Sequence, residues 1–142
     1  MALVTTSRRS TPLVRKIAKD LAFATGSTYL SRGKSGMRDI EHISSYYFVI
    51  SELRNSRIRI QLFSPDTLLL DLVVVDIQSG TRDWSLFRGI RTSDESYAKS
   101  IKRACSCETL VFESEFDAIS YDGQQKRYHT FIVERYHDVK KR

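Results

Sequence analysis

The chain has 142 residues, of which 41% are hydrophobic and 28% charged, and its formal net charge is +6. This length fits one domain with its own core, and the composition is typical of folded soluble proteins, which argues against an intrinsically disordered chain. The longest strongly apolar stretch, Leu68 to Val75, has eight residues and includes Asp71, whereas a bilayer span needs roughly 20 apolar residues, so no membrane crossing is expected.

The first predicted elements are a strand, a loop and a helix. Leu3 to Thr6 is short and β-prone, and turn-forming residues follow it. Thr11 can cap a helix through its hydroxyl, Pro12 suits the first helical position, and Gly26 suits the end. The face expected to be buried carries apolar residues at helical spacing: Leu13, Ile17, Leu21 and Ala24.

A second strand, loop and helix are predicted directly afterwards. The strand covers Thr28 to Ser31, the basic loop covers Arg32 to Gly36, and the helix covers Met37 to Ile43. The two glycines in the loop indicate a flexible connection. The strand, loop and helix pattern is thus used twice in succession.

The rest of the chain is predicted to be mainly strands. Three β-rich runs separated by turn-formers indicate a meander: Tyr46–Glu52, Arg57–Phe63 and Leu68–Ile77. Gly80 to Asp94 is expected to be a loop around Trp84 and Phe87, and Asp94 to cap a helix with Tyr97, Ile101 and Ala104 on one face. Three further strands are expected at Leu110–Glu113, Ala118–Tyr121 and Tyr128–Tyr136, with a turn at Asp122 and Gly123.

This order of elements predicts a single α/β domain. Both halves, roughly 1–75 and 76–142, consist of a helix followed by hairpin-like strands, which suggests an internal duplication. No residue-level repeat between the halves is visible in the sequence.

Positive charge is concentrated at the start of the chain. Residues 1–38 hold eight basic residues against one acidic residue, Asp20, whereas residues 39–142 hold 15 basic and 16 acidic residues. A field concentrated in this way can neutralise several phosphates and release their counterions, which is the dominant sequence-independent contribution to nucleic-acid binding. The charge distribution therefore predicts an RNA-binding surface near the start of the chain.

Two loops are candidate phosphate sites. Ser7 to Thr11 precedes a helix whose first-turn amides lack intrahelical partners, and Arg8 and Arg9 add charge-assisted donors. A well-capped helix start with solvated arginines explains this first loop equally well. Arg32 to Gly36 repeats the same chemistry, with Arg38 nearby. If both loops leave one sheet edge, they form a continuous phosphate track.

Other chemistries find little support. Gly33-Lys34-Ser35 lacks the glycine that a P-loop requires five positions earlier, where Thr28 stands, which argues against nucleoside-triphosphate hydrolysis. Four potential zinc ligands have spacings that fit structural zinc sites poorly: Cys105, Cys107, His129 and His137. No sequence motif places Ser, His and Asp together for catalysis. The sequence thus indicates no enzyme, metal or other cofactor.

Cysteine usage and the amino terminus bear on localisation. Cys105 and Cys107 are too close for an unstrained disulfide, and the chain has no other thiol, which favours a reducing, intracellular compartment. Met1 to Val4 lacks the apolar core of a secretory signal. An organelle transit peptide around Ser7 to Thr11 is an alternative, but strand and turn signals on both sides argue against it. The expected location is the cytoplasm.

Aromatic residues are candidates for stacking on RNA bases: Tyr46, Tyr47, Phe48, Tyr121, Tyr128 and Tyr136. They alternate with apolar residues in predicted strands, a pattern more typical of core or cross-strand pairs. The RNA interaction is therefore assigned to the cations.

The sequence resembles the Brix domain of ribosome-biogenesis proteins. Leu3-Val4-Thr5-Thr6-Ser7-Arg8 and the later Tyr29-Leu30-Ser31-Arg32-Gly33-Lys34 resemble the strand ending in Thr-Ser-Arg and the Asn-Arg-Gly-Lys segment that open this domain, with Ser31 where asparagine is common. Val111-Phe112 and Ile119-Ser120-Tyr121, ahead of Arg127-Tyr128-His129, resemble its late segment. The resemblance covers nearly all of residues 1–142, in the compact form typical of archaeal members.

The resemblance implies two similar halves of mixed sheet with helices, akin to the anticodon-binding domain of class II aminoacyl-tRNA synthetases. It also implies a non-enzymatic assembly factor that binds ribosomal RNA or its precursor, without a small-molecule substrate. Together with the charge pattern, it gives these candidate RNA-binding residues: Thr5, Thr6, Ser7, Arg8, Arg9, Arg15, Lys16, Arg32, Gly33, Lys34 and Arg38. Two alternatives stay open: a scaffold for ribosomal or other assembly proteins, and a tRNA-binding translation factor.

Overall fold

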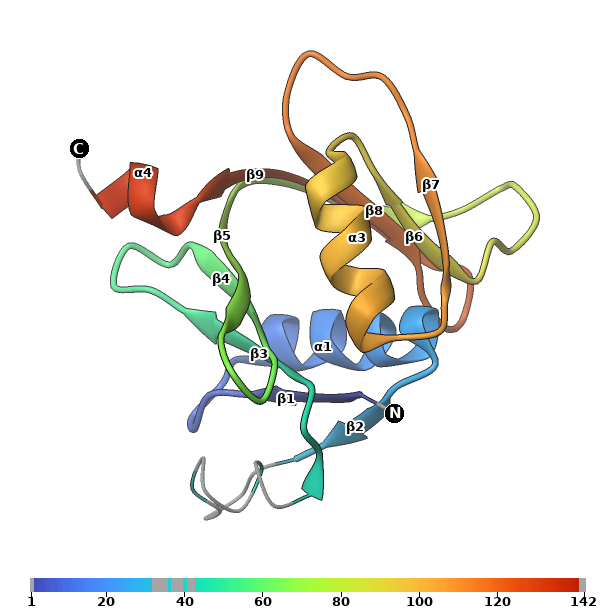
Figure 1. Ribbon diagram of the computed structural model, residues 1–142. Coiled ribbons are helices and arrows are strands. Elements are labelled where there is room, and N and C mark those ends of the chain that lie inside the picture. The colour runs from blue at the N-terminus through green and yellow to red at the C-terminus, as the bar shows by residue number, and fades with distance from the viewer. Residues whose placement is uncertain (1, 32–35, 37–39, 41–42, 141–142) are drawn as a thin grey trace.

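The computed structural model describes residues 2–31, 36, 40 and 43–140. Within these ranges no helix is both long enough and apolar enough to span a membrane. The described residues form a mixed α/β fold in which one nine-stranded sheet curls around two helices (Figure 1). The α/β class predicted from the sequence is confirmed.

The first unit consists of β1 (Leu3–Thr6), α1 (Pro12–Thr25) and β2 (Thr28–Leu30). The Thr11 hydroxyl accepts a hydrogen bond from the Val14 amide, and Gly26 ends the helix at φ 70°, so both predicted ends of α1 are confirmed. The predicted buried face is wrong at one position. Leu13 is 46% exposed, and Val14 is buried in its place.

The predicted meander is confirmed as β3 (Tyr47–Glu52), β4 (Ile58–Phe63) and β5 (Leu68–Thr81), which pair antiparallel in sequence order. The strand β5 is longer than predicted because it pairs with β9 (Arg127–Arg135) as far as Thr81. The glycine at position 80 does not interrupt this pairing. A loop across Gly80 and Thr81 was therefore a wrong prediction.

The second unit consists of β6 (Gly89–Thr92), α3 (Glu95–Ala104) and β7 (Glu108–Val111). The sequence predicted only a loop where β6 lies. Four residues are too few to show the alternation of apolar and polar side chains by which a strand is recognised without knowledge of the strands it pairs with. The predicted helix cap is confirmed, since the Asp94 carboxylate accepts hydrogen bonds from the Ser96 and Tyr97 amides. The strand β7 begins two residues earlier than the predicted Leu110.

The chain closes with β8 (Ala118–Asp122), β9 and the short helix α4 (Tyr136–Lys140), which the sequence did not predict. The β8–β9 connection was predicted as a turn at Asp122 and Gly123. It extends to Lys126, with Gln125 and Lys126 at φ 55° and 61°. Of the predicted helix from Met37 to Ile43, only positions 40 and 43 are described, and both are helical.

The order of strands in the sheet is β2-β1-β3-β4-β5-β9-β8-β6-β7. In each half a strand, a helix and a parallel edge strand follow one another, and β5 pairs with β9 to join the halves. Both α1 and α3 pack inside the curled sheet (Figure 1). One buried cluster contains residues of both halves, including Ile17, Ile50, Tyr97 and Phe131. A smaller cluster of Leu3, Ile40, Tyr47 and Val49 lies apart from it.

The aromatic side chains mostly belong to the core. Tyr47, Phe48 and Tyr121 are buried, and the other three candidates for base stacking are half-buried. Tyr47 stacks on Phe63 across two paired strands, with ring centroids 4.9 Å apart. The interpretation as core and cross-strand pairs is therefore confirmed for Tyr46, Tyr47, Phe48 and Tyr121.

Candidate nucleic-acid interface

Three parallel strands end at the same edge of the sheet. The strand β1 pairs in parallel with β2 on one side and with β3 on the other. The loops that follow them therefore leave the sheet together, at the carboxyl ends of their strands, where open α/β sheets usually bind ligands. The first of these loops holds Arg8 and Arg9, and both residues are exposed.

The second predicted loop approaches the first where it is described. The position that a Cβ atom on Gly36 would occupy lies 3.8 Å from Nη2 of Arg8. Four candidate residues of this loop and the following segment lie outside the described residues: Arg32, Gly33, Lys34 and Arg38. The described end of the second loop thus lies beside the first loop rather than on the far side of the molecule.

Thr5 and Thr6 face into the protein. Both are buried; the Thr5 hydroxyl donates to the Leu30 carbonyl at 2.7 Å, and the Thr6 hydroxyl donates to Oγ of Ser10 at 3.1 Å. The Ser7 amide donates to the Ile50 carbonyl at 3.0 Å. These three candidates therefore hold the first loop against β2 and β3, and the adjacent arginines are the residues that face solvent.

The start of α1 has less free hydrogen-bonding capacity than the sequence suggested. Pro12 has no N–H, the Val14 amide donates to the Thr11 hydroxyl, and the Arg15 amide donates to the Thr11 carbonyl. Arg15 also donates from its guanidinium to the Ser10 carbonyl. An anion at this helix start would therefore depend on side chains more than on backbone amides. Lys16, on the next position, is exposed.

The same edge carries two basic residues that the sequence analysis missed. The turn after β3 contains Arg54 and Arg57, and both are exposed. Because β3 is parallel to β1, this turn lies at the same edge as the loop with Arg8 and Arg9. We refer to Arg8, Arg9, Arg54 and Arg57 as the basic edge. The parallel pairing of β1 with β3 was the missing information.

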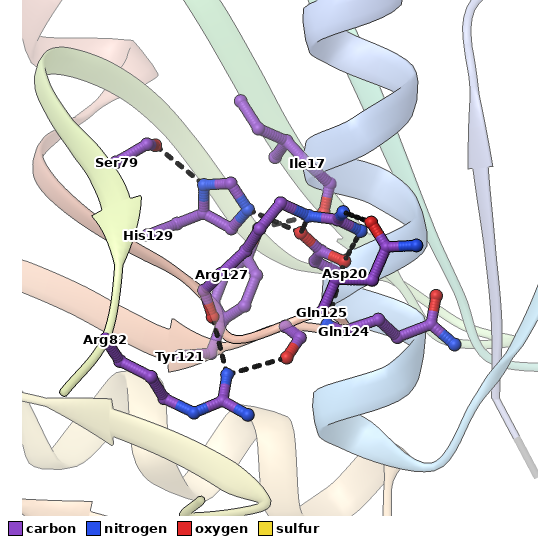
Figure 2. A network of polar contacts seen from close by, with 10 residues as sticks. Ile17, Asp20, Ser79, Arg82, Tyr121, Gln124, Gln125, Arg127 and His129 are labelled. Atoms are coloured by element: carbon purple, nitrogen blue, oxygen red, sulfur yellow. Dashed lines mark hydrogen bonds and ion pairs between the residues drawn. The ribbon is translucent and has the colours of Figure 1, made fainter. Parts of the chain in front are cut away.

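A buried polar network ties α1 to the last hairpin (Figure 2). Asp20 is fully buried and accepts hydrogen bonds from Nε and Nη2 of Arg127, both at 2.8 Å, and from the Gln124 amide at 3.2 Å. Nε2 of His129 lies 2.7 Å from the same carboxylate. In the Arg-Tyr-His segment of the family resemblance, His129 is thus buried, and Arg127 contacts the same buried carboxylate from the surface.

The network also has an electrostatic signature. Burial alone would raise the pKa of Asp20, but hydrogen bonds from Arg127 and His129 outweigh it and hold the pKa well below its usual range. Burial raises the pKa of Tyr121 well above its usual value, and its hydroxyl donates to the Ile17 carbonyl at 3.0 Å. Both contacts fasten α1 to the second half of the sheet.

Ser79, His129 and Asp20 form a hydrogen-bonded line that the sequence analysis did not foresee. Oγ of Ser79 lies 2.7 Å from Nδ1 of His129, whose other nitrogen meets Asp20. In a Ser-His-Asp triad the acid holds Nδ1 and the nucleophile meets Nε2, so the order is reversed here. Asp20 is also neutralised by Arg127. These contacts indicate a structural role, in which the three residues connect α1, β5 and β9.

The four potential zinc ligands of the sequence do not form a site. Across the described residues no group of three or more His, Cys, Asp or Glu could hold a metal ion. Cys105 is buried next to Ser27, with Sγ and Oγ 3.7 Å apart, and a hydrogen bond from Cys107 lowers the pKa of Cys105. His129 belongs instead to the Asp20 network.

The loop that follows β7 is acidic. It is drawn at the top of Figure 1, whereas the loop between β1 and α1 is drawn at the lower left. Glu113 and Glu115 are exposed in the loop after β7. Like charges repel phosphate, so this loop is unsuited to RNA.

Comparisons with known proteins give matches among solved structures only. No protein-family model matches the chain, and no curated protein does. The fold is similar to that of Mil, an archaeal Imp4-like protein, with a TM-score of 0.64 and 15% sequence identity, covering 94% of this chain and 96% of that chain. It is also similar to a probable ribosomal biogenesis protein from Aeropyrum pernix K1, with a TM-score of 0.61 and 21% identity, covering 94% of this chain and 95% of that chain.

At these identities the likeness establishes the fold, and it extends over almost the whole length of each chain. The chain therefore has the fold of an archaeal Imp4-like protein and of a probable ribosomal biogenesis protein, in agreement with the Brix resemblance of its sequence.

Proposed function

We propose that this chain is a non-enzymatic ribosome-biogenesis factor of the Brix family that binds ribosomal RNA or its precursor in the cytoplasm. The observation that carries the proposal is the convergence of three loops at one sheet edge, where Arg8, Arg9, Arg54 and Arg57 are exposed. Guanidinium groups bind phosphate oxygens through charge-assisted, often bidentate hydrogen bonds. A polynucleotide backbone along this edge would meet several of them at once.

The roles within this surface divide by burial. The residues that would contact backbone phosphates are Arg8, Arg9, Arg32, Lys34, Arg38, Arg54 and Arg57. Arg15 and Lys16 would continue the surface along α1. Thr5, Thr6 and Ser7 would position the first loop, because their hydroxyl or amide groups bond within the protein. Gly33 would let the backbone of the second loop approach the RNA closely. Such contacts fix position without reading base sequence.

The proposal extends to the architecture. Residues 1–142 would form one Brix domain of two duplicated halves, akin to the anticodon-binding domain of class II aminoacyl-tRNA synthetases. In its support, β1-α1-β2 and β6-α3-β7 are both strand-helix-strand units whose two strands pair in parallel, and both lie at an end of the sheet. The long strand β5 runs across the boundary near residue 75.

The site assignment is tested by the double substitution Arg8→Ala with Lys34→Ala. We expect affinity for rRNA fragments to fall roughly tenfold, and the salt dependence of binding to weaken by about 0.7 per lost phosphate contact on a single strand. The matched control is Lys99→Ala with Lys102→Ala, which removes the same charge from exposed positions on α3. Fluorescence anisotropy across a salt series gives both quantities.

Equal losses in the two double variants would mean that net charge alone binds RNA. An unchanged affinity and salt slope in a folded Arg8→Ala, Lys34→Ala protein would refute the site. Competition by tRNA at matched salt distinguishes a translation factor, because in that case tRNA would displace the rRNA fragments.

A further inference from the structure

A hollow of about 300 Å³ lies along the flank of α1, next to the first basic loop. Its lining consists of Pro12, Arg15, Lys16, Lys19 and Arg127. Four of these five residues are basic and none is acidic, so the hollow is suited to an anion. Neither Lys19 nor Arg127 was recognised from the sequence as part of the RNA-binding surface.

Arg127 reaches the hollow from the other half of the protein. It lies on β9 and is held in place from beneath by Asp20, which accepts from both Nε and Nη2 (Figure 2). Its Nη1 atom donates to Oε1 of Gln125 at 2.8 Å. These bonds use three of the five guanidinium N–H groups, and the side chain is 25% exposed. The guanidinium is therefore preorganised, with donor capacity left on its exposed side.

Different residues of the hollow supply its net positive charge and its fixed hydrogen-bond donors. Asp20 balances the charge of Arg127, so the net positive charge is supplied by Arg15, Lys16 and Lys19. Nζ of Lys19 lies 5.6 Å from the ring centroid of Tyr29, so the lysine also contacts β2. The hollow thus combines long-range attraction for an anion with a fixed arginine that can orient it.

The hollow continues the surface formed by the basic loops. It begins at Pro12, directly after the first loop, and reaches Lys19 about 10 Å further along the helix, at 1.5 Å per residue. We propose that it binds a phosphodiester group of the same RNA strand that lies on the basic loops. The strand would run from the loops along α1 to Arg127 and so contact both halves of the sheet. This inference rests on the proposed RNA-binding function.

The first test is the double substitution Lys16→Ala with Lys19→Ala, both at exposed helix positions. Binding of a single-stranded uridine RNA is measured across a salt series. We expect the salt slope to decrease by about 1.4 in magnitude, at about 0.7 per lost contact. The control is again Lys99→Ala with Lys102→Ala on α3, for which we expect the parental slope. A parental slope in the Lys16→Ala, Lys19→Ala protein overturns the inference.

The two proposals fail in different ways. If the parent protein does not bind the RNA at all, the proposed function is wrong. If the parent binds, and Arg8→Ala with Lys34→Ala weakens binding while Lys16→Ala with Lys19→Ala does not, the function stands and the hollow is not part of the strand's path.

The second test uses Arg127 directly. The substitution Arg127→Lys keeps the charge but removes the planar fork, so we expect weaker RNA binding with an unchanged salt slope, measured after unfolding curves show that the variant is folded. In the parent, the NMR signal of the Arg127 Nε–H group should shift with RNA and stay in place with inorganic phosphate. An equal shift with inorganic phosphate alone identifies a site for the free ion, and no shift with RNA rejects the contact; either result overturns the inference.

Discussion

Replacing Asp20 with asparagine is expected to lower the free energy of unfolding by about 3 to 5 kcal/mol, the range for removing one partner of a buried ion pair. The new amide would place an N–H group where a carboxylate oxygen now accepts from Arg127 or His129. His129 is 1% exposed, so it cannot turn to water for a replacement partner. Chemical denaturation with far-UV circular dichroism measures the difference.

The matched control for this substitution is Asp71→Asn. Asp71 accepts from Nε and Nη2 of Arg59, both at 2.7 Å, in the same paired geometry, but its side chain is 24% exposed. Solvent reaches both partners of this half-buried pair, whereas Asp20 is fully buried, so a smaller loss than at position 20 is expected, nearer the range of about 0.2 to 1 kcal/mol for solvent-exposed pairs. Equal losses at positions 20 and 71 would show that burial of the network does not matter to stability.

The same network gives the stability a pH dependence with a defined sign. The pKa of Asp20 is lower in the folded chain than in the unfolded chain, so between the two values the unfolded state binds more protons and stability rises with pH. The contribution is complete above about pH 5 and is lost as the pH falls below about 4. In the Asp20→Asn protein, the free energy of unfolding should lack this part of its dependence on pH. Parallel loss of stability in parent and variant as the pH falls below about 4 would contradict the account.

Gly123→Ala is expected to be the second strongly destabilising substitution, at about 3 kcal/mol or more. A Cβ atom at this position would lie 2.2 Å from Cγ and 2.5 Å from Oδ2 of Asp20. The carboxylate cannot move aside, because Arg127, His129 and the Gln124 amide all hold it. Either the β8–β9 turn shifts or the network breaks.

The control for this clash is Gly26→Ala at the end of α1. Gly26 has φ 70° but nothing within 4 Å of a new Cβ atom, so only the left-handed backbone is penalised, by about 1 kcal/mol.

Combined with Asp20→Asn, Gly123→Ala should lower the free energy of unfolding by less than the sum of the two single substitutions, because both act on one network. Full additivity in denaturation curves would show that the two positions act independently.

Local signals in the sequence were sufficient for much of the first unit. The Thr11 cap, Pro12 and Gly26 fixed both ends of α1, and charge alone indicated which loops to examine. The short strand β6 was missed because its four residues become a strand only through pairing with β7 and β8. Propensity does not contain that pairing information.

The residues of the site that were missed depend on contacts between distant parts of the chain. Arg54 and Arg57 join the basic edge because β3 pairs in parallel with β1. Arg127 reaches the flank of α1 because Asp20, 107 residues earlier, holds it there. Conversely, the sequence placed Thr5 and Thr6 at the RNA, whereas the structure buries both. All four residues of β1 are buried, so both faces of the strand are covered by protein. The sequence of such a strand has no alternation of polar and apolar residues that would show which side chains face solvent.

The central claim is that RNA lies along the basic loops at one end of the sheet. Ultraviolet crosslinking in cells, followed by sequencing of the RNA and mass spectrometry of the crosslinked peptides, tests it most directly. The account predicts ribosomal RNA or its precursor, attached to peptides that contain residues 7–19, 32–38 or 54–57. Crosslinks confined to the acidic loop at residues 113–115, or an attached RNA that is mainly tRNA, would contradict it.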